Sequence, residues 1–338
     1  MTAMWFPGKR SRFGWRLSSG VKGATSTFAQ IKVRVRVRLM SAVIAPLLLT
    51  SCHESTEPNP LVWSRFSTAT IQTLSSVWGS SDSDIWVPVN CCGSGGMILH
   101  YDGTFWTKIS TRTTQYLTGV WGSSASDVWA VGWNGTILHY NGTSWSSVSS
   151  GTTQNLNSVS GASASDVWAV GDGGTLLHYN GISWSSVTSG TTAPMHAVWG
   201  NSATDVWVVG STIIFHYDGA SWSAGTTGTT QSVYDVWGTD ASDIWVVGDA
   251  GTFLRYTGAN WSSGSITTEY LRGVWGTSAS DIWAVGDAGT ILHYNGKWSS
   301  LSSGTTQALR GVWGTTSTNV WAVGDLGTIL HEIGRAHV

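Results

Sequence analysis

A small group of charged and aromatic residues in the second half of the chain has side chains suited to acid–base chemistry. Glu269 and Tyr270 lie between Arg255 and Arg272 in the sequence, and Arg310 follows one repeat later. Hydrolysis of a glycosidic bond needs acid, base and nucleophile groups, carboxylates or a tyrosine, held in one pocket. Glu269 is the only Glu between residues 58 and 331, so this set of groups is incomplete. We therefore expect a protein that is not an enzyme, with a glycoside hydrolase as the alternative.

Cysteines and acidic turns are the other candidate sites. Cys91 and Cys92 are adjacent, and in an exported protein such a pair forms a vicinal disulfide, stays free or pairs between molecules. His100 would be a third ligand of a metal site, but adjacent cysteines lack the usual ligand spacing, so we predict no metal and no cofactor. Four Gly-Asp pairs are interpreted as turn formers, with Ca²⁺ or glycan binding as the alternative: Asp172, Asp249, Asp287 and Asp325.

These residues belong to a sequence that repeats itself. The motif LxxVWG recurs seven times at intervals of 38 to 43 residues, with copies that begin at Leu74, Leu117, Leu156, Met195, Val233, Leu271 and Leu309. A fixed period near forty residues is typical of solenoids, propellers and repeat arrays. The elements that position any site must therefore be built from one unit used many times.

One copy contains four short segments of strand-forming residues. From Leu117 they read LTGVWG, VWAVG, TILHY and WSSVSS, and we name them strands a, b, c and d. Clusters of Gly, Asn, Asp and Ser separate them, and the Asn-Gly between c and d is a strong hairpin signal because its turn needs positive φ. No segment has helical periodicity. Four antiparallel strands repeated in tandem predict an all-β fold, a β-propeller.

The ends of the repeat region predict the number of blades. Trp63 lies 11 residues before Leu74, as Trp145 lies 11 residues before Leu156, so the domain opens with a lone strand d. Six complete units follow, and the chain then closes with strands a, b and c. We expect seven blades over residues 62–331, with the first strand completing the last blade. Residues 332–338, EIGRAHV, match the translation of a common sequencing adapter, and we interpret them as an artefact.

The aromatic residues of the repeat have a packing role. Twenty of the 23 Trp occupy three positions of the repeat, in strands a, b and d, where indole rings would fill the space between neighbouring blades. A His in strand c should pack across the hairpin on the strand b Trp and come diagonally within reach of the Asp that opens strand b, with Arg255 in its place in blade 5: His100, His139, His178, His216, His293 and His331. An Asp that opens strand b is expected to hydrogen-bond the backbone of its own turn: Asp84, Asp127, Asp166, Asp205, Asp243 and Asp281.

The N-terminal segment has the features of an export signal. Three arginines, residues 34, 36 and 38, precede the apolar run LMSAVIAPLLLTSC, which is too short to span a bilayer. Residues 49–52, LTSC, resemble the lipobox of bacterial lipoproteins, which implies cleavage before Cys52 and a lipid on its thiol. We expect residues 1–51 to be removed, residues 1–32 to lie before the true start, and residues 52–61 to form a tether. The resemblance implies a protein anchored in the cell envelope of a Gram-negative type of bacterium, in the outer membrane or at the cell surface.

Charge and family resemblance narrow the function. Residues 52–331 carry a formal charge of −11, which disfavours nucleic-acid binding. The consensus DVWAVGDGGTILHYNG…W resembles tectonin repeats, a lectin-type propeller, and bacterial BNR-like propellers, including the photosystem II stability/assembly factor family. The resemblance implies the fold, and it makes a sialidase the precedent for a propeller hydrolase. Sialidases use an arginine cluster, for which Arg255, Arg272 and Arg310 are the candidates. The hairpin HYNGISW departs from the BNR Asp-box, so Asp-box properties are not expected.

Function should lie where the copies differ, on the face formed by the d–a and b–c loops. The second residue of strand a changes in nearly every blade, and a tryptophan enters one b–c loop. We expect this face of a monomer to bind a protein or glycan ligand, with the membrane contacted through the lipid alone. The candidate binding residues are Trp133, His196, Tyr234, Glu269, Tyr270, Arg272 and Arg310.

Overall fold

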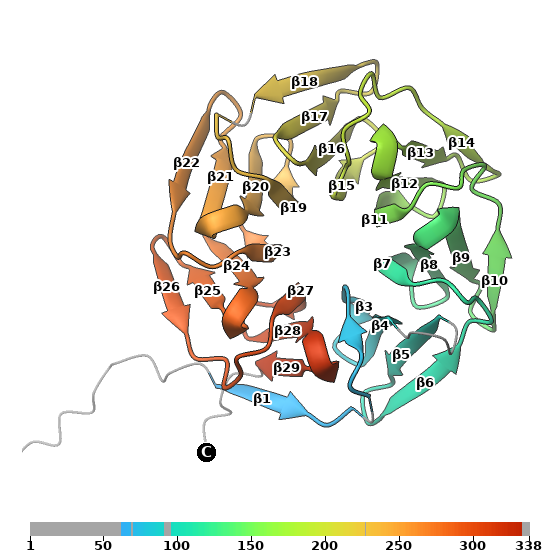
Figure 1. Ribbon diagram of the computed structural model, residues 1–338, viewed down its shortest axis with the longest axis horizontal. Helices are drawn as coiled ribbons and strands as arrows, with labels where there is room; N and C mark the ends of the chain where they lie inside the picture. The colour runs from blue at the N-terminus through green and yellow to red at the C-terminus, as the bar shows by residue number, and fades with distance from the viewer. Residues whose placement is uncertain (1–61, 69, 91–95, 227, 333–338) are drawn as a thin grey trace, which may run out of the picture. The chain divides into compact units, whose positions relative to one another are not determined.

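The computed structural model describes residues 62–332 except 69, 91–95 and 227. All of them lie in the second of two compact units of the chain, residues 57–338. In this unit the described residues form seven antiparallel sheets around a central axis (Figure 1), with strand a of each sheet nearest the axis and strand d outermost. This is a seven-bladed β-propeller, as predicted.

Blades 1 to 4 follow one another along the chain. Blade 1 contains β2 (Thr73–Leu74) and β3 (Trp78–Ser81), both paired with β4 (Asp84–Asn90), and then β5 (Met97–Tyr101) and β6 (Trp106–Ser110). Blade 2 contains β7 (Leu117–Ser124), β8 (Asp127–Gly132), β9 (Thr136–Tyr140) and β10 (Trp145–Val148). Blade 3 contains β11 (Leu156–Ser163), β12 (Asp166–Gly171), β13 (Leu176–Tyr179) and β14 (Trp184–Ser186). Blade 4 contains β15 (Ala197–Ser202), β16 (Asp205–Gly210), β17 (Ile213–Tyr217) and β18 (Trp222–Thr226).

Blades 5 to 7 complete the ring. Blade 5 contains β19 (Val233–Asp240), β20 (Asp243–Gly248), β21 (Thr252–Tyr256) and β22 (Trp261–Ser265). Blade 6 contains β23 (Leu271–Ser278), β24 (Asp281–Gly286), β25 (Ile291–Tyr294) and β26 (Trp298–Leu301). Blade 7 contains β27 (Leu309–Thr316), β28 (Asn319–Gly324), β29 (Ile329–Glu332) and β1 (Trp63–Phe66). Single 3₁₀ turns form five b–c links: η1 (Trp133–Gly135), η2 (Asp172–Gly174), η3 (Asp249–Gly251), η4 (Asp287–Gly289) and η5 (Asp325–Gly327).

The first and last strands of the ring share one sheet. β1 pairs antiparallel with β29, with Trp63 opposite Glu332 and Phe66 opposite Ile329. The predicted closure by the N-terminal strand is therefore present. β29 extends to Glu332, one residue beyond the predicted end of the domain at residue 331.

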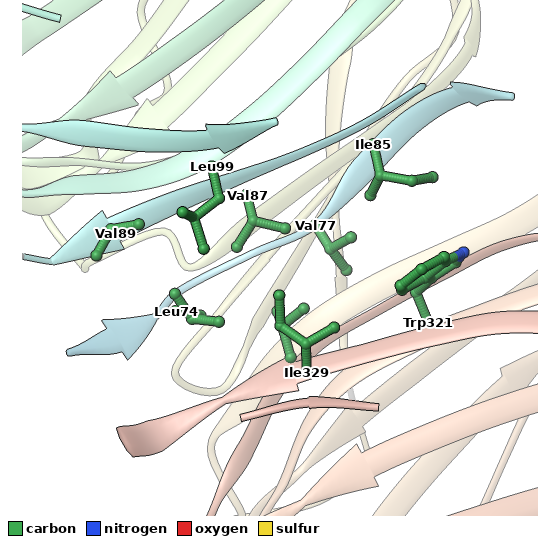
Figure 2. Close-up of a cluster of buried hydrophobic side chains, with 9 residues drawn as sticks. Leu74, Val77, Ile85, Val87, Val89, Leu99, Trp321 and Ile329 are labelled. Atoms are coloured by element: carbon green, nitrogen blue, oxygen red, sulfur yellow. The ribbon is translucent and has the colours of Figure 1, made fainter. Parts of the chain in front are cut away.

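The hydrophobic core lies in the seams between neighbouring blades. In the seam between blades 7 and 1, Trp321 and Ile329 pack against Leu74, Val87 and other buried aliphatic residues of blade 1 (Figure 2). The strand b indoles are almost completely buried, and the indoles of strands a and d are half-buried. Because each large ring removes some 150–250 Å² of surface from water, these seams carry much of the stabilisation.

The repeated histidine stacks on the strand b tryptophan as predicted. In blade 2 the ring centroids of Trp129 and His139 are 4.1 Å apart, and His139 Nε2 lies 2.6 Å from Asp127 Oδ1. The diagonal contact between the His and this Asp is present as predicted. The prediction that the Asp bonds its own turn backbone is wrong, because its two oxygens bind the imidazole and the hydroxyl of Ser123. The turn backbone is satisfied by a hydroxyl instead, since Ser126 N donates to Ser124 Oγ.

The Asn-Gly links between strands c and d form the expected tight turns. Gly142 has φ of 87°, and Asn141 Oδ1 accepts hydrogen bonds from the backbone N–H groups of Thr143 and Ser144. The side chain of the Asn thus holds the turn that the glycine's conformation permits.

Candidate functional site

The second residues of the seven strands a come together around one cavity. Its volume is about 630 Å³, and Gln72, Thr73, Asn90, Tyr116 and Trp133 complete its wall. We call it the axial cavity. A narrower space of about 230 Å³ is lined by the same second residues and by those that follow them along the same strands. The seven side chains are Ser75, Thr118, Asn157, His196, Tyr234, Arg272 and Arg310.

In blades 1 to 4 the second residue binds the neighbouring blade. Ser75 Oγ donates to the carbonyl of Leu117 at 2.8 Å, and Thr118 Oγ1 donates to that of Leu156 at 2.6 Å. Asn157 Nδ2 lies 2.9 Å from the Met195 carbonyl, and His196 Nδ1 lies 2.8 Å from the Val233 carbonyl. We call these four side chains the latched arc. Each of them therefore uses one polar group to join two blades.

In blades 5 to 7 the second residue binds an aspartate of its own b–c turn instead. Arg272 donates from Nε and Nη2 to the two oxygens of Asp287 at 2.5 and 2.8 Å. Arg310 donates in the same way to Asp325 at 2.6 and 2.9 Å. We call Tyr234, Arg272 and Arg310 the Asp-paired arc. Bidentate bonds of this kind fix the planes of both guanidinium groups.

Hydrogen bonding and burial shift the pKa values of residues in the Asp-paired arc and of one of its aspartate partners. The bonds to Asp287 raise the pKa of Arg272, and the bonds from Arg310 lower the pKa of Asp325. Burial raises the pKa of Tyr234 to about 12, and a hydrogen bond to Asp249 adds to that rise. At neutral pH the arc therefore presents Arg272 as a cation and Tyr234 as a neutral phenol.

The Gly-Asp pairs therefore do more than form turns. Three of them begin the 3₁₀ turns of blades 5 to 7 and also hold the Asp-paired arc. In blade 3 the carboxylate of Asp172 accepts hydrogen bonds from Asn155 and Asn157. The interpretation of these residues as simple turn formers was incomplete, because each carboxylate points toward the strand a residue of its own blade.

Aromatic and guanidinium groups form a continuous stack along the Asp-paired side of the axial cavity. The rings of His196 and Tyr234 are 5.3 Å apart and nearly parallel, at 29°. Arg272 Cζ lies 5.6 Å from the centroid of Tyr234 and 5.6 Å from that of Tyr270. Tyr270 is 44% exposed and lies outside the cavity wall. The stack holds these side chains in place while leaving ring faces and edges accessible.

A second aromatic wall comes from the other side of the ring. Trp133 begins η1 in blade 2, across the axis from η3 and η4 (Figure 1). Its indole packs edge-on against Tyr116 at 4.6 Å, and it remains 45% exposed. Trp133 is thus both packed on a neighbour and available to a ligand.

Two of the residues singled out in the sequence do not join this site. Arg255 occupies the position of the repeated His, where it donates to Asp243 at 3.0 Å and covers the ring of Trp245. Asp243 lies at the a–b end of the blade, so the arginine cluster expected for a sialidase is not assembled. Glu269 does not line the cavity, and its backbone carbonyl accepts the N–H of Gly251.

One charged residue that lines the narrower space was not identified from the sequence. Asp235 follows Tyr234 in β19, where the other blades carry only Gly, Ser or Ala. Its carboxylate accepts hydrogen bonds of 2.9 Å from the backbone N–H groups of Val236 and Val274, which lie in blades 5 and 6. Burial raises the pKa of Asp235 to about 7. The signal for it was present, as the one acidic residue in a column of small ones.

The remaining candidate features of the chain are metal ligands, membrane-spanning helices and the cysteines. Among residues 62–332, outside the gaps given above, no group of three or more His, Cys, Asp and Glu is placed to hold a metal ion. No helix in the same residues has the length and apolar character needed to cross a membrane. Cys52, Cys91 and Cys92, with the predicted lipid and disulfide, lie outside the described residues.

Comparison with known proteins finds similarity in structure only. No known family's sequence profile matches the chain, and no curated protein does. YCF48 bound to D1 peptide superposes with a TM-score of 0.67 at 14% identity, covering 82% of this chain and 96% of that one. Streptogramin B lyase superposes with a TM-score of 0.72 at 13% identity, covering 81% of this chain and 98% of that one. The WD40 propeller domain of Doa1 superposes with a TM-score of 0.67 at 11% identity, covering 80% of this chain and 96% of that one. The fold is shared with these proteins.

Proposed function

We propose that the protein is a non-catalytic recognition propeller that binds a segment of polypeptide in the axial cavity. One observation carries the proposal. The blades repeat the same packing residues, yet their seven second residues of strand a differ and converge on one cavity. Residues needed only for the fold would be free to repeat there as they do elsewhere.

The chemistry of the axial cavity fits a peptide. Guanidinium groups and aromatic rings are the side chains that contribute most to protein recognition. Arg272, Arg310, His196, Tyr234 and Trp133 supply both kinds, and hydrogen bonds or stacking fix each of them before a ligand arrives. Preorganisation lowers the entropic cost of binding. The similar structure of YCF48 is of a complex with D1 peptide, which supports a peptide as the ligand class.

A hydrolase is the weaker proposal for this site. Arg272 and Arg310 are engaged by carboxylates, Arg255 lies at the other end of its blade, and Glu269 is not in the cavity wall. A glycan remains an alternative ligand that the experiment below would reveal.

The test is selection of binders on the soluble chain that begins at residue 53. A phage-displayed library of random peptides and a glycan array are probed with the wild type, with Arg272→Gln and with Arg310→Gln. Phe105→Ser is the matched control, because Phe105 is 68% exposed in a c–d turn on the opposite face. We expect peptides that bind the wild type and the control equally and both arginine variants at least about tenfold more weakly. Capture of glycans alone, or peptides indifferent to both arginines, would refute the proposal.

The proposed location also has a direct test. We propose that Cys52 carries a lipid that anchors the protein, as a monomer, in the cell envelope, in the outer membrane or at the cell surface. Labelled palmitate should be incorporated into the wild-type protein and not into Cys52→Ser, and the variant should move from the membrane fraction to the soluble fraction. Equal labelling of both proteins would remove the anchor from the proposal.

A further inference from the structure

Two large aliphatic side chains are exposed in two segments that hydrogen-bond to each other beside the axial cavity. Ile71 is 76% exposed, and Leu326 is 54% exposed. Ile71 lies in the d–a loop of blade 7, where the other six blades have Thr. Leu326 is the middle residue of η5, where the corresponding turns have Asn134, Gly173, Ala250 and Ala288. We call Ile71 and Leu326 the rim patch.

The backbone of Leu326 makes its presence in this turn unusual. Its φ and ψ are 52° and 37°, in the left-handed region. That conformation is unfavourable for residues with a Cβ, and Asn and Gly tolerate it best. The side chain remains 54% exposed, so the described fold supplies only part of the hydrophobic gain that would offset this cost. A leucine here is better explained by contact with another molecule than by stability.

The rim patch is joined directly to the wall of the axial cavity. Asp325, which precedes Leu326, holds Arg310 and accepts a hydrogen bond of 3.0 Å from Thr73 Oγ1. Gly327, which follows it, donates its N–H to the carbonyl of Gln72 at 2.8 Å. Gln72, Thr73 and Arg310 all line the cavity. A ligand that leaves the cavity over η5 would therefore pass beside the rim patch.

A groove begins at Leu326 of the rim patch. It has a volume of about 820 Å³ and runs between blades 6 and 7, with Leu326, Ala288 and Leu301 among its lining residues. The rest of the lining is mainly Ser, Thr and Gly, and Arg65 is its one charged side chain. Hydroxyl and backbone groups of this kind suit the regularly spaced N–H and C=O groups of an extended chain.

We propose that the bound polypeptide leaves the axial cavity over blade 7, sets a large apolar side chain against Leu326 and Ile71, and continues into the groove. This inference rests on the proposed function and specifies its ligand as an extended peptide with an apolar residue next to the part held in the cavity. In an extended strand alternate side chains point to the same side, so one residue can contact the patch while its neighbours face solvent.

The test uses the residues that other blades carry at the same positions. Peptides selected on the wild type are titrated against Leu326→Asn and Ile71→Thr in the soluble chain from residue 53. We expect binding to weaken about tenfold for each variant, as for the loss of one well-buried aliphatic contact. Selection repeated on the double variant should yield peptides without the apolar residue. Gly173→Asn changes the same turn position in blade 3 and should leave binding unchanged.

Stability separates this role from a structural one. Leu326→Asn should raise the midpoint of urea unfolding, because Asn tolerates the left-handed conformation, while it weakens peptide binding. A fall in both stability and binding would indicate a structural role and overturn the inference. Peptides that depend on Arg310 yet bind both rim-patch variants like the wild type would overturn this inference alone. Failure of the wild type to select any peptide would overturn the proposed function and this inference with it.

Discussion

Single residues that differ from their equivalents in the other blades change the electrostatics of the site, and the effect on stability can be measured. Asp235 is the clearest case, because a carboxylate replaces Gly, Ser or Ala in the wall of the narrower space that the strands a line. Its two hydrogen bonds from backbone N–H groups favour the charged form, but burial outweighs them and raises its pKa to about 7. The residue joins blades 5 and 6 at an electrostatic cost.

The charge of Asp235 should make stability depend on pH. Its pKa in the folded state, about 7, lies above the ordinary value of 3.8, so between these values the folded protein holds a proton that the unfolded chain releases. Raising the pH through this range therefore favours unfolding. We expect the unfolding free energy of Asp235→Ser, relative to wild type, to rise between pH 4 and pH 7 in urea titrations.

The comparison with the variant is needed because His331 acts in the opposite direction. Burial lowers its pKa to about 4, so the unfolded chain binds a proton between pH 4 and 6.5 that the folded protein does not. Stability from this group is lost as the pH falls through that range. Ser is the matched replacement, since Ser158 Oγ accepts the Val198 N–H at the equivalent seam. Parallel pH profiles for wild type and Asp235→Ser would show that Asp235 ionises normally.

Within the strands and turns of the blades, tryptophans have different roles that depend on where they lie. Trp321 of β28 is fully buried between blades 7 and 1, with His331 stacked on it at 3.7 Å. Trp133 of η1 lies at the rim of the axial cavity and is 45% exposed. The first is a packing residue and the second a candidate contact for the ligand.

Replacing these two tryptophans by alanine should separate the roles. Trp321→Ala leaves a cavity in a closed seam and should cost about 3–5 kcal/mol of unfolding free energy. Trp133→Ala loses an edge-on contact with Tyr116 and should cost no more than about 1 kcal/mol. Urea unfolding followed by far-UV circular dichroism measures both without relying on indole fluorescence. Similar losses for the two variants would contradict this assignment.

The repeat made the strands and blades predictable from the sequence, but not all the side-chain bonds of the site. The number of blades follows from counting the copies and their ends. The stack of His139 on Trp129 depends on register within one hairpin, which turn residues fix. The bond between Arg272 and Asp287 depends on how a b–c turn lies over strand a of its blade, which the pattern does not specify. The place of Arg255 was predictable, because the repeat puts it at the His position, opposite Trp245 and away from Arg272 and Arg310.

The whole molecule depends on the joining of its two ends. Blade 7 takes β27, β28 and β29 from the end of the described chain and β1 from its beginning. Without β1 the outer edge of β29 would lose its partner, and Trp63 would no longer pack on Trp283 of blade 6. Exposed strand edges promote association with other chains.

Removal of the closing strand β1 should therefore lower the free energy of unfolding by more than the loss of four residues suggests. A chain that begins at residue 68 should unfold at a lower urea concentration and form larger species in size-exclusion chromatography. A chain that begins at residue 62 keeps β1 and is the matched control. Identical midpoints and elution volumes for the two chains would show that the three-stranded blade suffices.

The antiparallel pairing at this junction also determines how the ring yields to mechanical load. Trp63, at the start of β1, faces Glu332, at the end of β29, so both ends of the domain emerge at the same end of the paired strands. Tension between the termini would separate Trp63 from Glu332 first, then Ser64 from His331, in a peeling sequence rather than by simultaneous shear of four residue pairs. The junction that completes the ring is therefore also where stretching by the ends would open it, at low force.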